Sequence, residues 1–122
     1  MYIAYLTNQM QTNASPTHAG GGSTKELALK ASTYYANQHP WVKLVPFSRA
    51  PKWAQQETKE AAMWHLHNFS IGLDFGTPIQ SEIEFVLDQI KVLEKFWLYP
   101  AEAKDVLVIK QEIERNPSCK IS

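Results

Sequence analysis

The sequence predicts an α+β fold in which a small sheet (a β-α-β start) is followed by three helices. Two short apolar runs, Tyr2–Leu6 and Trp41–Phe47, are typical of strands, and a helix-forming segment separates them. Residues 77–99 repeat apolar side chains at helical spacing over several turns. The length of 122 residues fits one domain, 1–122, with its own hydrophobic core.

Composition and charge narrow the classes of function. The chain has 12 basic and 12 acidic residues, so its formal net charge is zero. A neutral chain is a poor candidate for nucleic-acid binding through phosphate attraction, and no apolar run approaches the ~20 residues of a membrane span. The single cysteine, Cys119, excludes an intrachain disulfide framework and is typical of a reduced compartment. We therefore expect a cytoplasmic protein that binds neither membranes nor nucleic acid.

The first half of the chain predicts a strand, a helix and a second strand. Ser23 and Glu26 have the spacing of a capping box, which predicts that the helix begins at Ser23. Pro40 should end this helix near His39. The order strand, helix, strand is compatible with a right-handed βαβ unit, in which the two strands run parallel. The strand at 41–47 is apolar on both faces, which predicts a covered position in the sheet.

Two shorter helical segments flank the longest one. Pro51 suits the first position of a helix, and the glycines at 72 and 76 mark its end. Pro100 opens a last helix that ends near Asn116. The run 105–109 is also short enough to be a buried strand. Strands there, or at 69–73 and 96–99, would instead give a small Rossmann-like α/β sheet, which is the alternative fold.

The long amphipathic helix is predicted over 78–98. Thr77, Pro78 and Gln80 supply the cap, the first-position proline and the third-position amide that favour a helix start. One apolar face follows the i, i+3, i+4, i+7 spacing and contains Ile79, Ile83, Val86, Leu87, Ile90, Leu93 and Trp97.

A second apolar stripe on this helix consists of Phe85, Val92 and Phe96, turned by about a third of a revolution. One stripe is enough to dock a helix on its own core. The second must be covered by the last helix, by a ligand or by another chain. The sequence therefore predicts an interface made by Phe85, Val92, Phe96 and Trp97. The function this favours is a small non-enzymatic interaction protein, of the inhibitor or adaptor type. It would bind a protein partner, or a second copy in a homo-oligomer, through a helical aromatic surface.

The glycine-rich segment before the first helix supports an alternative function. Glycines let a backbone approach an anion closely, and the free amides of a helix N-terminus favour negative charge. The spacing differs from that of a P-loop, and a flexible linker ending in a helix cap is the competing interpretation. The alternative is a small-ligand protein that binds a nucleotide or another phosphorylated ligand through His18, Gly20, Gly21, Gly22, Ser23, Thr24 and Lys25.

A short family resemblance extends this alternative. The segment Ile79-Gln80-Ser81-Glu82-Ile83 follows a Gly-Thr pair, and it resembles the glutamate segment of nucleoside 2-deoxyribosyltransferase-like proteins. In that family a glutamate is the nucleophile on the sugar, so the resemblance implies this role for Glu82 in a nucleoside-processing enzyme. The match covers only these few residues, and the spacing from Gly76 to Glu82 is longer than the family pattern.

The other motifs in the sequence do not indicate a catalytic site or a metal site. His65 and His67 would point about 200° apart on a helix, which prevents a shared metal site. Asp74-Phe75-Gly76 matches the kinase tripeptide, but the chain has no catalytic HRD segment and no glycine-rich kinase loop. The spacing of Ser, His and Asp residues suggests no triad. We therefore predict no catalytic residues, no metal and no cofactor.

Overall fold

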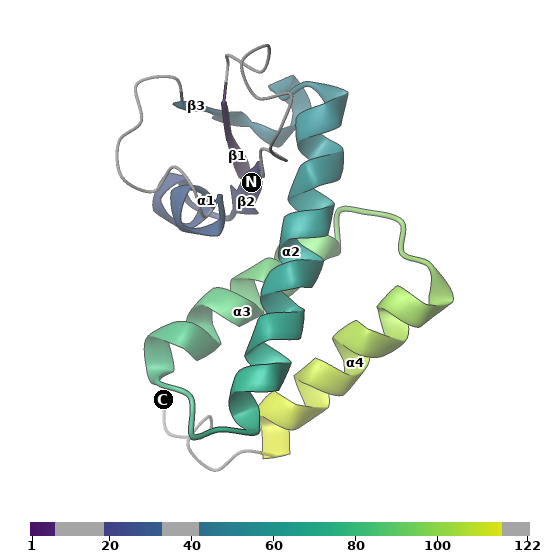
Figure 1. Ribbon diagram of the computed structural model, residues 1–122. Helices are drawn as coiled ribbons and strands as arrows, with labels where there is room; N and C mark the ends of the chain where they lie inside the picture. The colour runs from purple at the N-terminus through teal and green to yellow at the C-terminus, as the bar shows by residue number, and fades with distance from the viewer. Residues whose placement is uncertain (7–18, 33–41, 116–122) are drawn as a thin grey trace, which may run out of the picture.

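A computed structural model describes residues 1–6, 19–32 and 42–115 of the chain (Figure 1). The predicted α+β class is confirmed, because a small antiparallel sheet is combined with α-helices. In chain order the elements are β1 (Tyr2–Leu6), β2 (Gly20–Gly22), α1 (Lys25–Ala31), β3 (Val42–Pro46), the 3-10 helix η2 (Phe47–Arg49), α2 (Lys52–Leu73), α3 (Gln80–Leu93) and α4 (Pro100–Arg115).

The sheet has the order β2-β1-β3, and both strand pairs are antiparallel. Tyr2 lies opposite Gly22 on one side and opposite Pro46 on the other. The interpretation of the first half as a βαβ unit is therefore wrong, because such a unit requires β1 and β3 to run parallel. The Rossmann-like alternative is also wrong. Residues 69–73 and 105–109 are helical, and residues 96–99 form no strand.

β1 occupies the centre of the sheet, and Ile3 and Ala4 on it are fully buried. β3 lies at the edge of the described sheet, and its side chains at 42, 44 and 45 are only half buried. The predicted covered position for the strand at 41–47 is therefore wrong for its described part, while Trp41 lies outside the described residues. An apolar run on both faces did not distinguish an edge strand from a central one.

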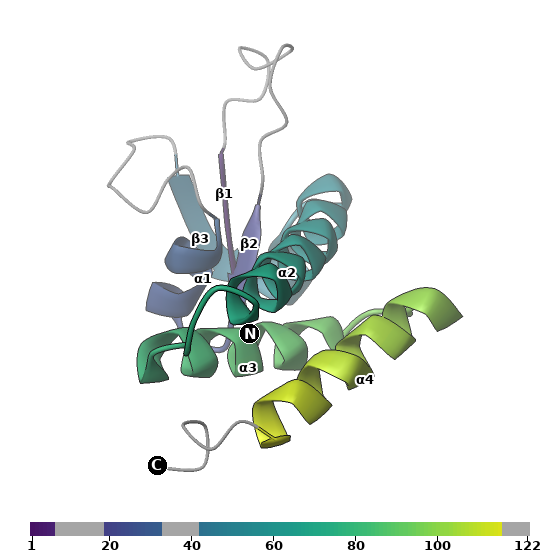
Figure 2. The same ribbon diagram turned by 60° about the horizontal axis from the view of Figure 1, so that its bottom comes forward.

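Helix α2 joins the two halves of the fold. The sheet packs on its first half, the end of α1 contacts it at His65, and α3 and α4 pack along it, with Glu102 of α4 paired to Lys59 (Figures 1 and 2). A small core under the sheet contains Ile3, Tyr5, Ala19, Ala50 and Ala54. The larger core between the helices includes Leu66, Phe69, Ile83, Val86, Ile90, Leu93, Val106, Ile109 and Ile113. Ala54 near the start of α2 belongs to the first core and Leu66 to the second, so one helix is part of both.

The starts of α1, α2 and α3 differ from the predicted ones by one or two residues. Thr24 caps α1 by accepting a hydrogen bond from the amide of Leu27, so the predicted cap at Ser23 is wrong by one residue. The predicted end of this helix near His39 falls outside the described residues. Helix α2 begins directly after Pro51, close to the prediction. Helix α3 begins at Gln80 after extended Ile79, so the predicted start at Pro78 is also wrong.

The long helix is shorter than the predicted 78–98. Helix α3 ends at Leu93, and the amides of Lys95 and Phe96 bond to carbonyls three residues back, as in a tightening last turn. Residues 96–99 then form a connection rather than further helix, because Pro100 disfavours helical geometry in the residue before it. Pro100 opens α4 as predicted, and 105–109 are helical. Within the described residues, no helix combines the length and apolar character needed to cross a membrane.

Candidate functional site

The glycine-rich segment is a buried strand, so the predicted loop at Gly20–Gly22 is wrong. A Cβ atom on Gly20 would collide with the backbone of Ala31 and Ser32 at the end of α1. A Cβ on Gly21 would lie 2.6 Å from Cγ2 of Thr58 on α2. These glycines therefore let three elements of this chain approach one another, and their missing side chains leave no open space for a ligand.

The residues after the glycines also make contacts within the chain. The carboxylate of Asp88 on α3 accepts hydrogen bonds from the amide, at 3.2 Å, and the hydroxyl of Ser23. The ammonium of Lys25 lies 5.6 Å from the ring centroid of Tyr2. Ser23, Thr24 and Lys25 are exposed as well, so anion binding by these three residues stays a prediction. His18 lies outside the described residues.

Two of the four predicted interface residues belong to the core. Phe85 and Val92 are only 9% and 2% exposed, so most of each side chain is covered within the chain, and Phe85 also lines the groove between α1, α2 and α3. Val92 would lie 3.3 Å from a Cβ on Gly21, which places it against β2. Phe96 is half buried, with its ring centroid 5.5 Å from that of Phe47. Val92 is thus covered by β2 and Phe96 by η2, whereas Phe85 lies against α2, with its ring centroid 4.9 Å from that of His65.

Trp97 is the predicted interface residue that is freely exposed, at 69%. It packs edge-to-face on Tyr99, with ring centroids 4.6 Å apart. Both rings lie in the connection between α3 and α4, not on a helix face. Trp97 is therefore separate from the buried stripe with which the sequence grouped it.

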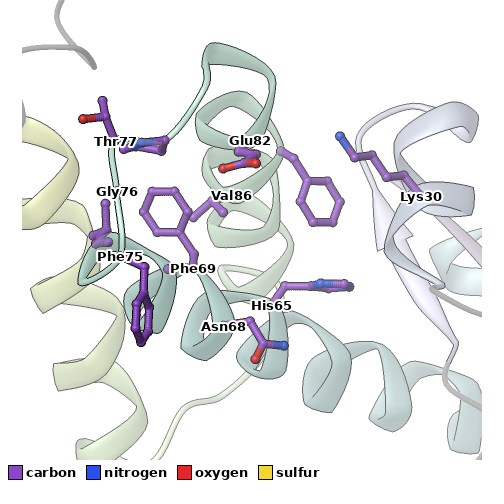
Figure 3. A pocket seen from close by; sticks show the side chains of 13 residues that line it. Lys30, His65, Asn68, Phe69, Phe75, Gly76, Thr77, Glu82 and Val86 are labelled. Atoms are coloured by element: carbon purple, nitrogen blue, oxygen red, sulfur yellow. The ribbon is translucent and has the colours of Figure 1, made fainter.

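A groove of about 480 Å³ lies between the end of α1, the second half of α2 and the start of α3 (Figure 3). Its apolar lining comes from Phe69 on α2 and from Phe85 and Val86 on α3. The connection between α2 and α3 forms a further wall that includes Phe75. The sequence placed Glu82 with the glycine segment, but the structure places it in this groove.

Charged and polar groups surround this apolar lining. The Lys30 ammonium lies 4.9 Å from the ring centroid of Phe85, and the Glu82 carboxylate lies on the same groove (Figure 3). Among the described residues, neither Lys30 nor Glu82 takes part in an ion pair. Nε2 of His65 lies 2.8 Å from the carbonyl oxygen of Ala31. A carbonyl can only accept, so this ring nitrogen carries the proton. The bond ties the end of α1 to α2.

The most unusual side chain at the groove is Phe75. It is 86% exposed, and its ring points away from Glu82 (Figure 3). Ile71 and Ile79, on either side of it in the chain, are 44% and 60% exposed. Trp64 is also exposed and lies two turns before Ile71 on the same face of α2. The sequence pattern did not predict this surface, because Phe75 lay between the glycines that mark a helix end and Ile79 lay on the apolar face expected to dock on the core.

The chain matches no known protein family, no curated protein and no solved structure. Within the described ranges, no group of three or more His, Cys, Asp or Glu residues is placed to hold a metal ion. The groove geometry is therefore the basis for the function proposed below.

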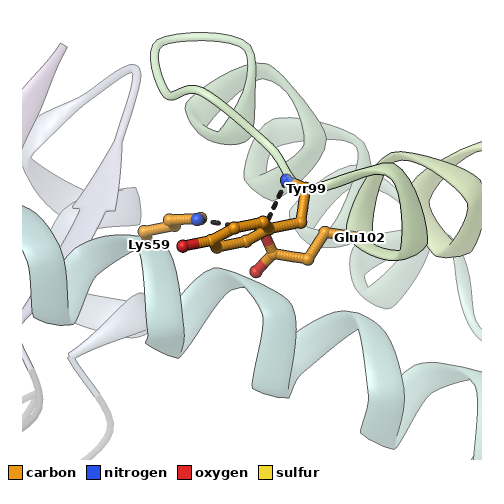
Figure 4. Close-up of polar contacts among 3 residues, drawn as sticks. All are labelled: Lys59, Tyr99 and Glu102. Atoms are coloured by element: carbon orange, nitrogen blue, oxygen red, sulfur yellow. Dashed lines mark hydrogen bonds and ion pairs between the residues drawn. The ribbon is translucent and has the colours of Figure 1, made fainter.

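A separate polar cluster attaches α4 to α2 (Figure 4). The carboxylate of Glu102 lies 3.0 Å from the ammonium of Lys59, which is buried on α2. The same carboxylate accepts a hydrogen bond of 2.9 Å from the amide of Tyr99. The Lys59 ammonium also lies 5.2 Å from the Tyr99 ring centroid. This cluster fixes the first turn of α4 and the aromatic pair that precedes it.

These contacts make Glu102 sensitive to acid. The hydrogen bond from Tyr99, and then the bond to Lys59, lower the pKa of Glu102. A lowered folded-state pKa contributes stability above the unfolded-state pKa of about 4.3, and this is lost as the pH falls through the folded value. We expect Glu102→Gln to lower the free energy of unfolding by about 1 kcal/mol at pH 7 and by less in acid. Urea denaturation from pH 3 to pH 7 measures this. Glu112→Gln, at an exposed position of α4, is the matched control and should change little.

Proposed function

We propose that this chain is a non-enzymatic interaction protein that binds a protein partner through the groove between α1, α2 and α3. The observation that carries the proposal is the 86% exposed ring of Phe75 at the edge of an apolar groove. Leaving a large aromatic side chain in water forgoes the stabilisation that its burial would give. Aromatic side chains are enriched among the residues that dominate binding energy at interfaces.

The extent of the apolar surface favours a protein over a small molecule. Ile71, Ile79 and Trp64 are exposed beyond the groove lining itself. A small ligand would be enclosed by the groove and would leave these side chains in water. A protein surface can cover the groove and its apolar surroundings together, with polar groups at the rim.

A small-ligand function is the second candidate, and one observation favours it. The groove volume of about 480 Å³ falls in the usual range for small-molecule sites, and Lys30 and Glu82 offer one charge of each sign. Such a site is distinct from the predicted glycine-segment site, although it retains Glu82. A thermal-shift screen with nucleosides, nucleotides and amino acids tests it, because a ligand that binds the native state must raise the melting temperature. No shift at millimolar ligand would exclude the members of that panel.

The interaction proposal predicts that Phe75→Asp weakens partner binding by about 30-fold or more, as expected when a side chain at the centre of an interface is lost. The measurement is capture from cells that express the tagged chain, followed by titration of the purified captured protein. Leu107→Asp is the matched control, because Leu107 is 54% exposed on α4 and does not line the groove. Binding that survives Phe75→Asp but is lost in Leu107→Asp would place the interface on α4 and reject the groove.

A further inference from the structure

We propose that the groove binds an extended segment of its partner, in which an apolar, a basic and an acidic side chain follow one another along the chain. The apolar side chain packs on Phe75, the basic one pairs with Glu82, and the acidic one pairs with Lys30. This inference rests on the proposed function and names the chemistry of the partner. The order of three side chains along the groove and an unpaired carboxamide in its wall support it.

Lys30 and Glu82 give the groove one cation and one anion beside the same aromatic ring. The Lys30 ammonium lies 4.9 Å from the ring centroid of Phe85, and Glu82 precedes Phe85 by about one turn of α3. Both side chains are exposed, and among the described residues neither takes part in an ion pair. A partner with only one sign of charge would be attracted by one of them and repelled by the other. The groove therefore favours a partner segment that carries one charge of each sign.

The position of Glu82 fixes the order in which these side chains meet a partner. Glu82 lies between Phe75, in the connection after α2, and Lys30, near the end of α1 (Figure 3). A segment that lies along the groove contacts the three in turn. The two ends of this line differ in chemistry, because one is an exposed aromatic ring and the other an ammonium. The bound segment therefore presents its side chains in the order apolar, basic, acidic, from one end or the other.

The carboxamide of Asn68 favours an extended segment over a helical one. Asn68 lines the groove from α2, is exposed, and makes no hydrogen bond to another described residue. A carboxamide can donate one hydrogen bond and accept another, which matches the carbonyl and the amide of a peptide backbone. In a helix these backbone groups are bonded within the helix, whereas an extended segment leaves them free. An extended partner can therefore bond to Asn68 as well as to the two charges.

A selection of random short peptides, displayed on phage, against the immobilised full chain tests the occupant. The enriched peptides should share an apolar, a basic and an acidic residue in this order, read from one end or the other. Phe75→Asp should abolish their enrichment. Leu107→Asp, exposed on α4 outside the groove, is the control and should enrich the same pattern. Enriched peptides without this pattern, or an enrichment that survives Phe75→Asp, overturn the inference.

Charge reversal on both molecules tests the two pairings, with calorimetric titration of one selected peptide. Lys30→Glu should weaken binding by about tenfold, because the acidic residue of the peptide then meets a carboxylate. A peptide with lysine in place of that acidic residue should recover the affinity for this variant. Glu82→Lys should be rescued in the same way by an acidic residue at the basic position. Lys110→Glu, exposed on α4 outside the groove, is the matched control. Folded variants that no reversed peptide rescues reject the pairings.

A backbone test separates an extended segment from a helix. Asn68→Ala should weaken peptide binding by about tenfold, because two hydrogen bonds are lost. Methylating the peptide's backbone nitrogens one at a time should identify a position where binding to the unmodified chain is lost. At that position the methyl group should cost much less in the Asn68→Ala variant, since the bond is already absent. An equal loss in both proteins, or a peptide that becomes helical on binding, rejects the extended segment.

The two proposals fail in different ways. If no peptide is enriched but Phe75→Asp abolishes capture of another protein, the extended segment is rejected and the interaction function stands. If no peptide is enriched and sedimentation velocity shows a dimer that Phe75→Asp dissociates, the occupant is a second copy and the inference is again overturned. If neither capture nor peptide binding depends on Phe75, both proposals are rejected.

Discussion

Replacing Gly20 by alanine is expected to lower the free energy of unfolding by about 3 kcal/mol or more. The added Cβ would overlap the backbone of Ala31 and Ser32, where no flexible side chain can move aside. Either α1 must move away from β2, or β2 must leave its register with β1. Both changes open the small core under the sheet. Urea denaturation followed by circular dichroism measures the loss.

Gly72→Ala is the matched control for this change. Gly72 lies in α2, and a Cβ there would meet nothing within 4 Å. Alanine is favoured over glycine in a helix by about 0.5–1 kcal/mol, so this variant should be slightly more stable than the unmodified protein. Equal stability of the Gly20→Ala and Gly72→Ala variants would show that β2 does not pack against α1 as described.

Val92→Asp is expected to lower the free energy of unfolding by at least about 4 kcal/mol, which is enough to unfold many domains of this size. Val92 is 2% exposed and packs against β2, so the introduced carboxylate would be buried among apolar atoms. The predicted outcome is a largely unfolded chain, visible as loss of cooperative thermal melting.

Leu87→Asp provides the comparison on the same helix. Leu87 is 40% exposed on α3, so a carboxylate there stays in contact with water. This variant should remain folded, with a change of about 1 kcal/mol or less. A folded Val92→Asp variant that has merely lost its partner would restore the sequence-based view that Val92 lies at an interface.

Periodicity predicted the helical part of the fold well. Ile83, Val86, Ile90 and Leu93 of the first apolar face of the long helix are buried, although Leu87 of that face is 40% exposed. That face extends too far in both directions, however, because Ile79 and Trp97 are 60% and 69% exposed. Helical spacing continues past the point where the backbone leaves the helix, so periodicity alone does not locate the ends.

The sheet was harder to predict, because β2 consists of three glycines and has no side chains beyond hydrogen. Gly20–Gly22 have the composition of a flexible linker, and only their pairing with β1 and their contact with α1 make them a strand. Long-range contacts of this kind leave no periodic signal in the sequence. The antiparallel direction of the strands could not be predicted for the same reason, since the order of elements along the chain also fits a parallel unit.

The candidate site was predicted only in part. Glu82 was singled out and does line the groove, but its neighbours Lys30 and Phe75 come from elements that the sequence gave no reason to join. Phe75 belongs to the candidate site because its side chain is exposed to solvent, and the residues next to it in the sequence do not predict that exposure. The second apolar stripe was assigned to contact with the last helix, a ligand or another chain, whereas β2, η2 and α2 pack against it.

Helix α2 sets a limit on how the chain can change during evolution. Its 22 residues form a rod of about 33 Å that contributes to the sheet core near one end and to the helical core near the other. One residue inserted between these ends would turn the two halves by about 100° relative to each other and would take both cores out of phase. Among the described residues, the connections at 74–79 and 94–99 lie outside α2, so an insertion there leaves the phase of the two cores unchanged. The first of these connections also carries Phe75, so the exposed surface around this ring can vary in length and composition without disturbing the alignment of the two cores.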